Sequence, residues 1–319
     1  MPLPAPRRLC LPRLALAAAA LLSLAPPIAP AWADEGARPA LVLAATASAV
    51  RPWMSPDVGA AWSMGFRGQG TTITVIDQFL SGQSFAGNLG TGVSSRRHGD
   101  WTRLQAGMVA PGARIVTQDF SKTTAVRLAT GLNTLNLSYG MYAQAGLAAG
   151  QIGWSPREAS IIGFAARSQA VVAKAAGNDG IAVNAANARG QVDYLNTALT
   201  GTATAIFVGA LSSNGTAQAP ASLASYSNFA GTDARVQAQF LSVGVRSDIT
   251  GLAGTSFAAP VVSGYAAILG SKFRAATPGQ IASQLLTTAR TDTILNYTAG
   301  LHGRGEASLS RALAPVAIR

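Results

Sequence analysis

The sequence predicts an α/β protein in which a mainly parallel sheet is covered by helices on both faces. Short apolar segments rich in β-branched residues alternate along the chain with stretches of helical periodicity. This alternation is typical of β-α-β units, whose crossover helices cover both faces of a parallel sheet. The chain has 319 residues, of which 49% are hydrophobic and 12% charged, which suits a folded protein of one large or two small domains.

The clearest strand is predicted over residues 71–76, a β-branched run that ends at Asp77. Further short strands are expected over residues 113–116, 134–137, 170–173 and 205–208. One helix is expected to begin near His98, where apolar residues recur at spacings of three and four. A second helix is expected to begin at Ser256, with Val261, Tyr265 and Ile268 on one face.

The first 33 residues have the order of a secretory signal peptide. A basic start precedes the apolar run 14–25, and Ala31-Trp32-Ala33 provides a cleavage site before Asp34. The alternative is a membrane anchor, but the apolar run is well short of the roughly 20 residues that a span needs. We therefore expect an exported protein, periplasmic or extracellular, with no stable membrane insertion after cleavage. Residues 34–57 are expected to form a short N-terminal extension, and residues 58–319 the main domain.

Charge and cysteine content exclude several classes of function. The net charge of +11 is scattered, without a Lys/Arg run, so nucleic acid is not expected as a partner. The only cysteine, Cys10, lies in the leader, which excludes a disulfide, a thiolate metal site or a cysteine nucleophile in the mature chain. Acidic residues are few and no loop is rich in Asp and Asn, so a calcium site is not supported. No other metal and no cofactor is expected.

The motif most specific for a chemical function runs from Gly254 to Pro260 with the sequence GTSFAAP. Its small residues let the chain turn sharply into a helix, so that Ser256 presents its hydroxyl where exposed N–H groups favour a developing negative charge. An ordinary helix-capping serine is the alternative interpretation. Pro260 falls in the first helical turn, where a missing N–H costs little.

Three other motifs carry polar groups that are weak signals when each is taken alone. Asp77 ends a predicted buried strand and could fix the tautomer of a histidine, although strands often end in Asp at a turn. The pair His98-Gly99 opens a predicted helix, whereas the second histidine, His302, lies in a glycine-rich segment and is interpreted as structural. Asn178 follows a predicted strand in the segment AAGNDG, which by itself is a turn.

Taken together, these motifs resemble those of the subtilisin-like serine peptidases, the subtilase family S8, from about residue 58 to residue 314. The order Asp, His, Ser is the order found in that family. The resemblance implies a three-layer fold with a mainly parallel seven-stranded sheet between helices. It assigns Asp77, His98 and Ser256 as the catalytic triad and Asn178 as the side-chain donor to the oxyanion.

The resemblance also implies the substrate and its binding strand. The segment Asn136 to Gly140 resembles the strand that lines the substrate channel, which makes Ser138, Tyr139 and Gly140 candidate substrate-binding residues. The expected substrate is a peptide or protein, cleaved by an endopeptidase through an acyl-enzyme intermediate.

The sequence departs from the family pattern in three places. Asp100-Trp101 stands where the family usually has Thr-His, and Gln78 follows Asp77 where Thr-Gly or Ser-Gly is usual. Phe257 follows the candidate nucleophile in place of the Met of well-known members. These departures leave a second hypothesis, a subtilisin-like scaffold with little proteolytic activity that acts as a binding protein.

Overall fold

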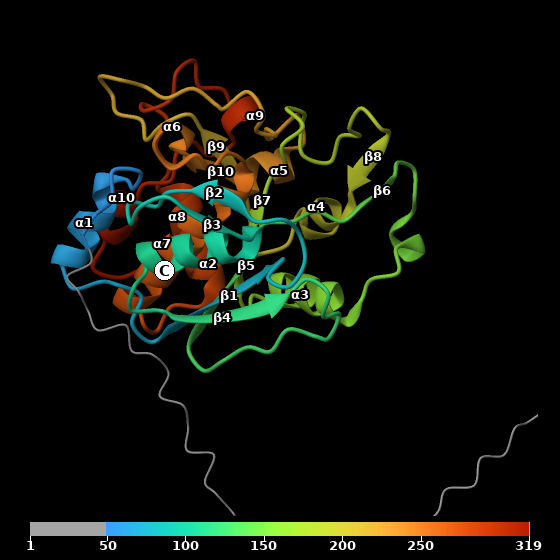
Figure 1. Ribbon diagram of the computed structural model, residues 1–319, viewed down its shortest axis with the longest axis horizontal. Helices are drawn as coiled ribbons and strands as arrows, with labels where there is room; N and C mark the ends of the chain where they lie inside the picture. Colours follow the sequence, from blue (N-terminus) through green and yellow to red (C-terminus); the bar gives the residue numbers. More distant parts are fainter. Residues whose placement is uncertain (1–48, 319) are drawn as a thin grey trace, which may run out of the picture. The chain divides into compact units, whose positions relative to one another are not determined.

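A six-stranded parallel sheet lies at the centre of the computed structural model, which describes residues 49–318 (Figure 1). In spatial order its strands are β10 (Phe240–Gly244), β9 (Ala205–Leu211), β7 (Val171–Ala175), β5 (Leu132–Leu137), β1 (Thr71–Asp77) and β4 (Arg114–Asp119). Every neighbouring pair in this sheet is parallel. The predicted α/β fold with a parallel sheet between helices is confirmed.

The sheet has one strand fewer than the seven implied by the family resemblance. The other strands of the described residues form two separate antiparallel pairs. These are β2 (Phe85–Gly87) with β3 (Ser94–Arg96), and β6 (Tyr142–Gln144) with β8 (Gln191–Asp193). Each of these strands makes its ladder hydrogen bonds to its own partner and none to the main sheet, so neither pair adds a seventh strand.

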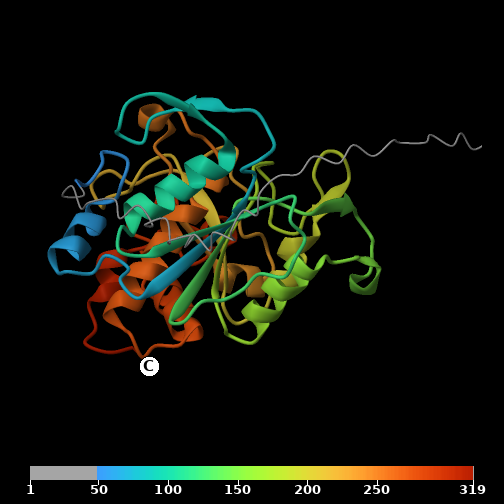
Figure 2. The same ribbon diagram turned by 60° about the horizontal axis from the view of Figure 1, so that its bottom comes forward.

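Helices cover both faces of the sheet and enclose two separate hydrophobic cores. One core contains side chains of α1 (Pro56–Ser63), α2 (His98–Val109), α7 (Ala259–Lys272), α8 (Pro278–Thr287) and α10 (Leu309–Leu313). The opposite core contains side chains of α3 (Pro156–Ala166), α4 (Tyr194–Leu199) and α5 (Ala234–Gln239). Figure 2 shows α3 across the sheet from α2. The short helices α6 (Ser247–Thr250) and α9 (Ala299–His302) and the 3₁₀ turns η1 (Ala149–Gln151) and η2 (Thr255–Phe257) complete the described structure.

The inner strands are buried on both sides because both faces of the sheet are covered. In β1, Ile73 and Val75 belong to the core that contains α2 and α7, whereas Ile76 belongs to the opposite core. Successive side chains of a strand point to opposite faces, so a strand covered on both sides has to be apolar at consecutive positions.

Helices α2 and α7 pack closely in the first core (Figures 1 and 2). A Cβ atom added at Gly264 of α7 would lie 2.5 Å from Cγ1 of Val109 of α2, so only glycine allows this approach. The contact matters for the site, because His98 is the first residue of α2 and Ser256 lies just before α7.

We expected the main domain to begin at residue 58. The boundary between residues 57 and 58 falls inside α1, so the folded domain begins earlier in the chain. Trp53 and Met54 are already buried in the first core, and Trp53 donates a hydrogen bond to the Leu89 carbonyl at 3.0 Å. The predicted signal peptide, residues 1–33, lies outside the described residues, as does the extension up to residue 48. Within residues 49–318, no helix has the length and apolar character needed to span a membrane.

Candidate active site

The candidate residues lie where neighbouring parallel strands end. Asp77 is the last residue of β1, Ser138 follows the end of β5, and Asn178 lies three residues after the end of β7. These strands are consecutive in the sheet order β7-β5-β1. Because parallel strands end at one edge, the fold gathers these polar groups on the carboxyl side of the sheet, where open α/β sheets bind ligands.

Asp77 and His98 form a direct contact. Oδ1 of Asp77 lies 2.6 Å from Nδ1 of His98, and the Asp77 residue is only 2% exposed. The same carboxylate accepts hydrogen bonds from the Gln78 backbone N–H at 2.7 Å and from the Thr102 hydroxyl at 2.8 Å. A buried carboxylate held in this way can fix the orientation and tautomer of the histidine ring.

Thr102 is a contributor that the sequence interpretation missed. It lies four residues after His98 on α2, and residues at that spacing share a helix face. That spacing was the available signal, but it is a weak one, because threonines also occur inside helices that carry no catalytic group.

Only glycine fits at position 99, directly after His98, because a side chain there would clash with the loop after Asp77. A Cβ atom at Gly99 would lie 2.7 Å from the Gln78 carbonyl oxygen and 2.9 Å from the Phe79 ring. The N–H of Gly99 donates to the same carbonyl at 3.0 Å. The first turn of α2 thus rests on the backbone that follows Asp77, and this contact brings His98 to the carboxylate.

Ser256 lies in the 3₁₀ turn η2, and α7 begins three residues after it, at Ala259. The prediction that the helix begins at Ser256 itself was therefore wrong. Gly254 has a φ of 125°, which only glycine adopts readily, and the following N–H groups of Phe257 and Ala258 bond three residues back rather than four. The tight turn presents Ser256 ahead of the helix.

The hydroxyl of Ser256 donates to the Ser138 carbonyl oxygen at 3.3 Å, and the Ser138 hydroxyl donates to the Ser256 carbonyl at 2.9 Å. Within residues 49–318, Ser256 and His98 share no hydrogen bond. Phe257, the next residue, has its ring centroid 5.6 Å from that of His98. The Asp77–His98 pair is thus formed, the residue after Ser256 contacts His98, and the Ser256 hydroxyl is turned to the β5 side.

Asn178 is oriented by Thr255. The side-chain oxygen of Asn178 accepts from the Thr255 N–H at 2.8 Å and from the Thr255 hydroxyl at 3.0 Å. With the oxygen occupied in this way, the amide NH₂ is directed away from Thr255, and it donates no hydrogen bond within the described residues. Thr255 belongs to the motif around Ser256, but its role in orienting Asn178 was not predicted.

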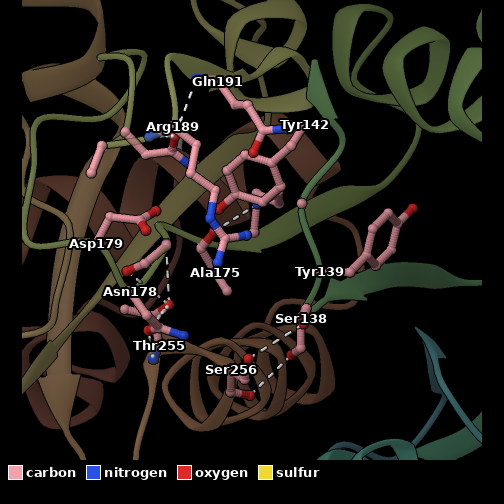
Figure 3. A pocket seen from close by; sticks show the side chains of 15 residues that line it. Ser138, Tyr139, Tyr142, Ala175, Asn178, Asp179, Arg189, Gln191, Thr255 and Ser256 are labelled. Carbon is pink, nitrogen blue, oxygen red and sulfur yellow. Dashed lines mark hydrogen bonds between the residues drawn. The ribbon is translucent and has the colours of Figure 1, made fainter. Parts of the chain in front are cut away.

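A cavity of about 570 Å³ opens beside Ser256 (Figure 3). Its wall includes the predicted residues Ser138, Tyr139, Gly140, Asn178 and Ser256. The other lining residues are Tyr142, Lys174, Ala175, Gly177, Asp179, Asn187, Ala188, Arg189, Gln191 and Thr255. The structure therefore brings the candidate substrate-binding segment, the candidate nucleophile and the candidate oxyanion donor to one cavity.

The ring of Tyr139 is held by contacts with other residues of the protein. It packs edge-on against Phe120, with ring centroids 4.9 Å apart, and its hydroxyl lies 3.2 Å from a carboxylate oxygen of Glu158. Burial and the neighbouring Glu158 charge raise the pKa of Tyr139 far above its ordinary value. The ring therefore anchors the strand, and binding of substrate by its hydroxyl is not supported.

His302 lies on α9 and is 2% exposed. Its ring stacks on Tyr297 with centroids 5.8 Å apart, and burial lowers the pKa of its imidazole. These contacts fit the structural interpretation. Within residues 49–318, no three His, Cys, Asp or Glu side chains cluster in a way that could hold a metal ion.

Solved structures of proteases share this fold. MycP1 from Mycobacterium smegmatis matches with a TM-score of 0.55 and 20% identity, over 84% of this chain and 85% of that one. A lanthipeptide protease matches with a TM-score of 0.54 and 19% identity, over 79% of this chain and 89% of the other. MycP3 of a type VII (ESX-3) secretion system matches with a TM-score of 0.53 and 21% identity, over 83% and 91%. No curated protein matches the chain by sequence.

The family model of the subtilases matches residues 91–303, a segment that includes His98, Asn178 and Ser256 and begins after Asp77. Asp77 is the one candidate triad residue outside the matched segment, and its hydrogen bond to His98 connects it to that segment. The chain belongs to the subtilase family of serine peptidases, peptidase family S8.

Proposed function

We propose that this protein is an exported serine endopeptidase that hydrolyses peptide bonds through an Asp77-His98-Ser256 triad. The observation that carries the proposal is the 2.6 Å contact between Asp77 and His98, beside a cavity lined by both Ser256 and Asn178. Membership of the subtilase family supports the same reaction class.

Each residue has a role that follows from its chemistry. Asp77 accepts the Nδ1–H of His98, which leaves Nε2 free to take the proton of the Ser256 hydroxyl as Ser256 attacks the peptide carbonyl. The NH₂ of Asn178 and the backbone N–H of Ser256 stabilise the oxyanion. His98 then protonates the leaving amine, and water hydrolyses the acyl-enzyme by the reverse sequence of proton transfers.

One observation favours the alternative of a binding protein with little proteolytic activity. The Ser256 hydroxyl donates to the Ser138 carbonyl instead of to His98. In free enzymes, however, catalytic hydrogen bonds are often long or misaligned and tighten only when substrate binds. Rotation about one Cα–Cβ bond is enough to redirect a serine hydroxyl.

Labelling with a fluorophosphonate probe separates the two hypotheses. An activated Ser256 should bind the probe with a stoichiometry of one, measured by intact mass, and Ser256→Ala should not react. Ser283→Ala, at an exposed serine of α8, is the matched control and should be labelled fully. A folded wild-type protein that neither binds the probe nor cleaves a denatured protein substrate would support the binding-protein hypothesis.

Export is a separate part of the proposal and rests on the leader, residues 1–33. N-terminal sequencing of protein recovered from the periplasm or the medium should begin at or near Asp34. Recovery of exported protein that begins at Met1 would contradict cleavage of the leader, and absence of the protein from both the periplasm and the medium would contradict export.

A further inference from the structure

The cavity beside Ser256 contains a buried cation at its wall. Lys174, on β7, is 1% exposed, and its ammonium group donates to Asp193 at 2.9 Å and to the Ala175 carbonyl at 2.7 Å. A lysine ammonium has three N–H donors, so one remains for a further acceptor. Lys174 is among the residues that line the cavity.

A second cation extends into the same cavity. Arg189 lies in the turn before β8, and Figure 3 shows its guanidinium reaching towards Ala175, between Tyr142 and Asp179. Among residues 49–318, no carboxylate lies within 4.0 Å of the Arg189 guanidinium. A guanidinium presents paired N–H donors that match the two oxygens of a carboxylate.

Two further titratable groups line the cavity. Tyr142 is a neutral hydrogen-bond donor, because burial and the charges of Asp193 and Asp179 raise its pKa to about 12. Asp179 is the one carboxylate among the lining residues. Asp193 does not line the cavity, but it balances the charge of Lys174. The charge preference of the cavity therefore depends on whether the substrate side chain contacts Arg189 or Asp179.

We propose that this cavity binds an acidic side chain, Asp or Glu, of the residue whose carbonyl Ser256 attacks, with Arg189 as the residue that determines this specificity. The inference rests on the proposed peptidase function. The substrate carboxylate pairs with Arg189 and receives a further hydrogen bond from Lys174 or Tyr142. A basic side chain would instead meet the Arg189 charge, which no described carboxylate within 4.0 Å offsets, and Asp179 is the one lining carboxylate that could attract it.

The cleavage test uses internally quenched peptides that differ only at the residue before the scissile bond: Glu, Asp, Gln, Leu or Lys. Gln has the size of Glu without its charge, so the Glu-to-Gln ratio of kcat/KM isolates the electrostatic contribution. We expect a preference for Glu of about five- to tenfold at low salt, the range between an exposed ion pair and a charge-assisted hydrogen bond. The preference should shrink as salt is added, since Arg189 is exposed.

Variants of Arg189 identify the determinant. Arg189→Gln should bring the Glu-to-Gln ratio close to one, and Arg189→Glu should favour Lys. Arg274→Gln, which changes an exposed arginine outside the cavity lining, should keep the wild-type ratio. A wild-type preference for Lys over Glu would overturn the proposal and point to Asp179, and equal rates for Glu and Gln would also overturn it.

A binding measurement keeps the inference testable without catalysis. Fluorescent forms of the same peptides are titrated with Ser256→Ala, and binding is followed by anisotropy. Tighter binding of the Glu peptide than the Gln peptide, lost when Arg189→Gln is added, supports the inference even if the wild-type protein cleaves nothing. Equal binding of the two peptides overturns the inference. The peptidase proposal is tested independently, by probe labelling at Ser256.

Discussion

Thr255 holds Asn178 in place through two hydrogen bonds to one oxygen, at 2.8 Å from its N–H and 3.0 Å from its hydroxyl. The Thr255 hydroxyl also accepts from the Gly177 N–H at 3.1 Å. The residue before the candidate nucleophile is thereby tied to the loop that carries the candidate oxyanion donor.

This contact predicts a graded loss of turnover. Asn178→Ala removes the donor itself and should lower kcat by about 10²–10³-fold, the usual effect of losing one oxyanion donor, with KM little changed. Thr255→Val keeps the size but removes one of the two bonds that orient Asn178, so kcat should fall less. Thr255→Ser retains the hydroxyl and is the control. Steady-state kinetics on one peptide would measure all three, and unchanged kcat in Asn178→Ala would exclude the oxyanion role.

The buried ion pair of Lys174 and Asp193 predicts a strong dependence of stability on both partners. The side chains are 1% and 6% exposed, and Asp193 also accepts from the backbone N–H groups of Met141 and Leu195. Lys174→Met leaves a buried carboxylate without its partner and should lower the free energy of unfolding by about 3–5 kcal/mol.

The control for this prediction is the exposed pair of Arg235 and Asp233. Arg235→Ala should change the free energy of unfolding far less than Lys174→Met does, because exposed pairs contribute little. Urea denaturation of both variants provides the comparison. Equal losses in the free energy of unfolding at the two pairs would show that burial does not increase the contribution of the Lys174–Asp193 pair to stability.

Asp119 predicts a pH dependence of stability. Burial alone would raise the pKa of its carboxyl, but hydrogen bonds from Ser121, Leu80 and Phe79 outweigh burial and hold the pKa well below its ordinary value of 3.8. The carboxylate therefore stabilises the folded state above about pH 4, and this contribution is lost as the pH falls below that value.

Asp119→Asn tests this dependence. The variant should be less stable at pH 7 by about 1–3 kcal/mol, because the loop after Asp77 loses acceptors for its N–H groups. Its stability should also fall less than that of the wild type between pH 5 and pH 3, measured by urea denaturation at each pH. Parallel pH profiles for the two proteins would contradict the assignment.

Phe257 predicts resistance to peroxide. Its ring is 3% exposed and lies against His98 and Phe85, next to Ser256. A methionine there would be converted by peroxide to a polar sulfoxide beside His98 and Ser256. Phe257→Met should therefore lose activity in peroxide while the wild type retains it, as followed by residual kcat/KM over time. Equally fast inactivation of both proteins would show that another residue is the sensitive one.

The local pattern of the sequence was sufficient to predict the fold class and the family. The apolar runs identified five of the six strands of the main sheet and missed β10. The segment around Ser256 carried the resemblance, because tight turns and helix starts depend on small residues at fixed spacing. The same reasoning misplaced the start of α7, since the sequence does not distinguish a 3₁₀ turn from the first turn of an α-helix. It also expected a seventh strand, whereas backbone pairing between segments far apart produced a separate pair, β6 with β8.

The sequence by itself determined the order of the motifs and the residue types available for catalysis. Only the tertiary structure decided which side chains surround them: Thr102 on the Asp77 carboxylate, Asp193 on Lys174, and Arg189 in the cavity beside Ser256. These contacts join residues on different strands, helices and loops, and no local periodicity encodes them. They form because the two cores fix the strand order and the packing of α2 on α7, and buried polar groups must then find partners among whatever side chains that packing brings near.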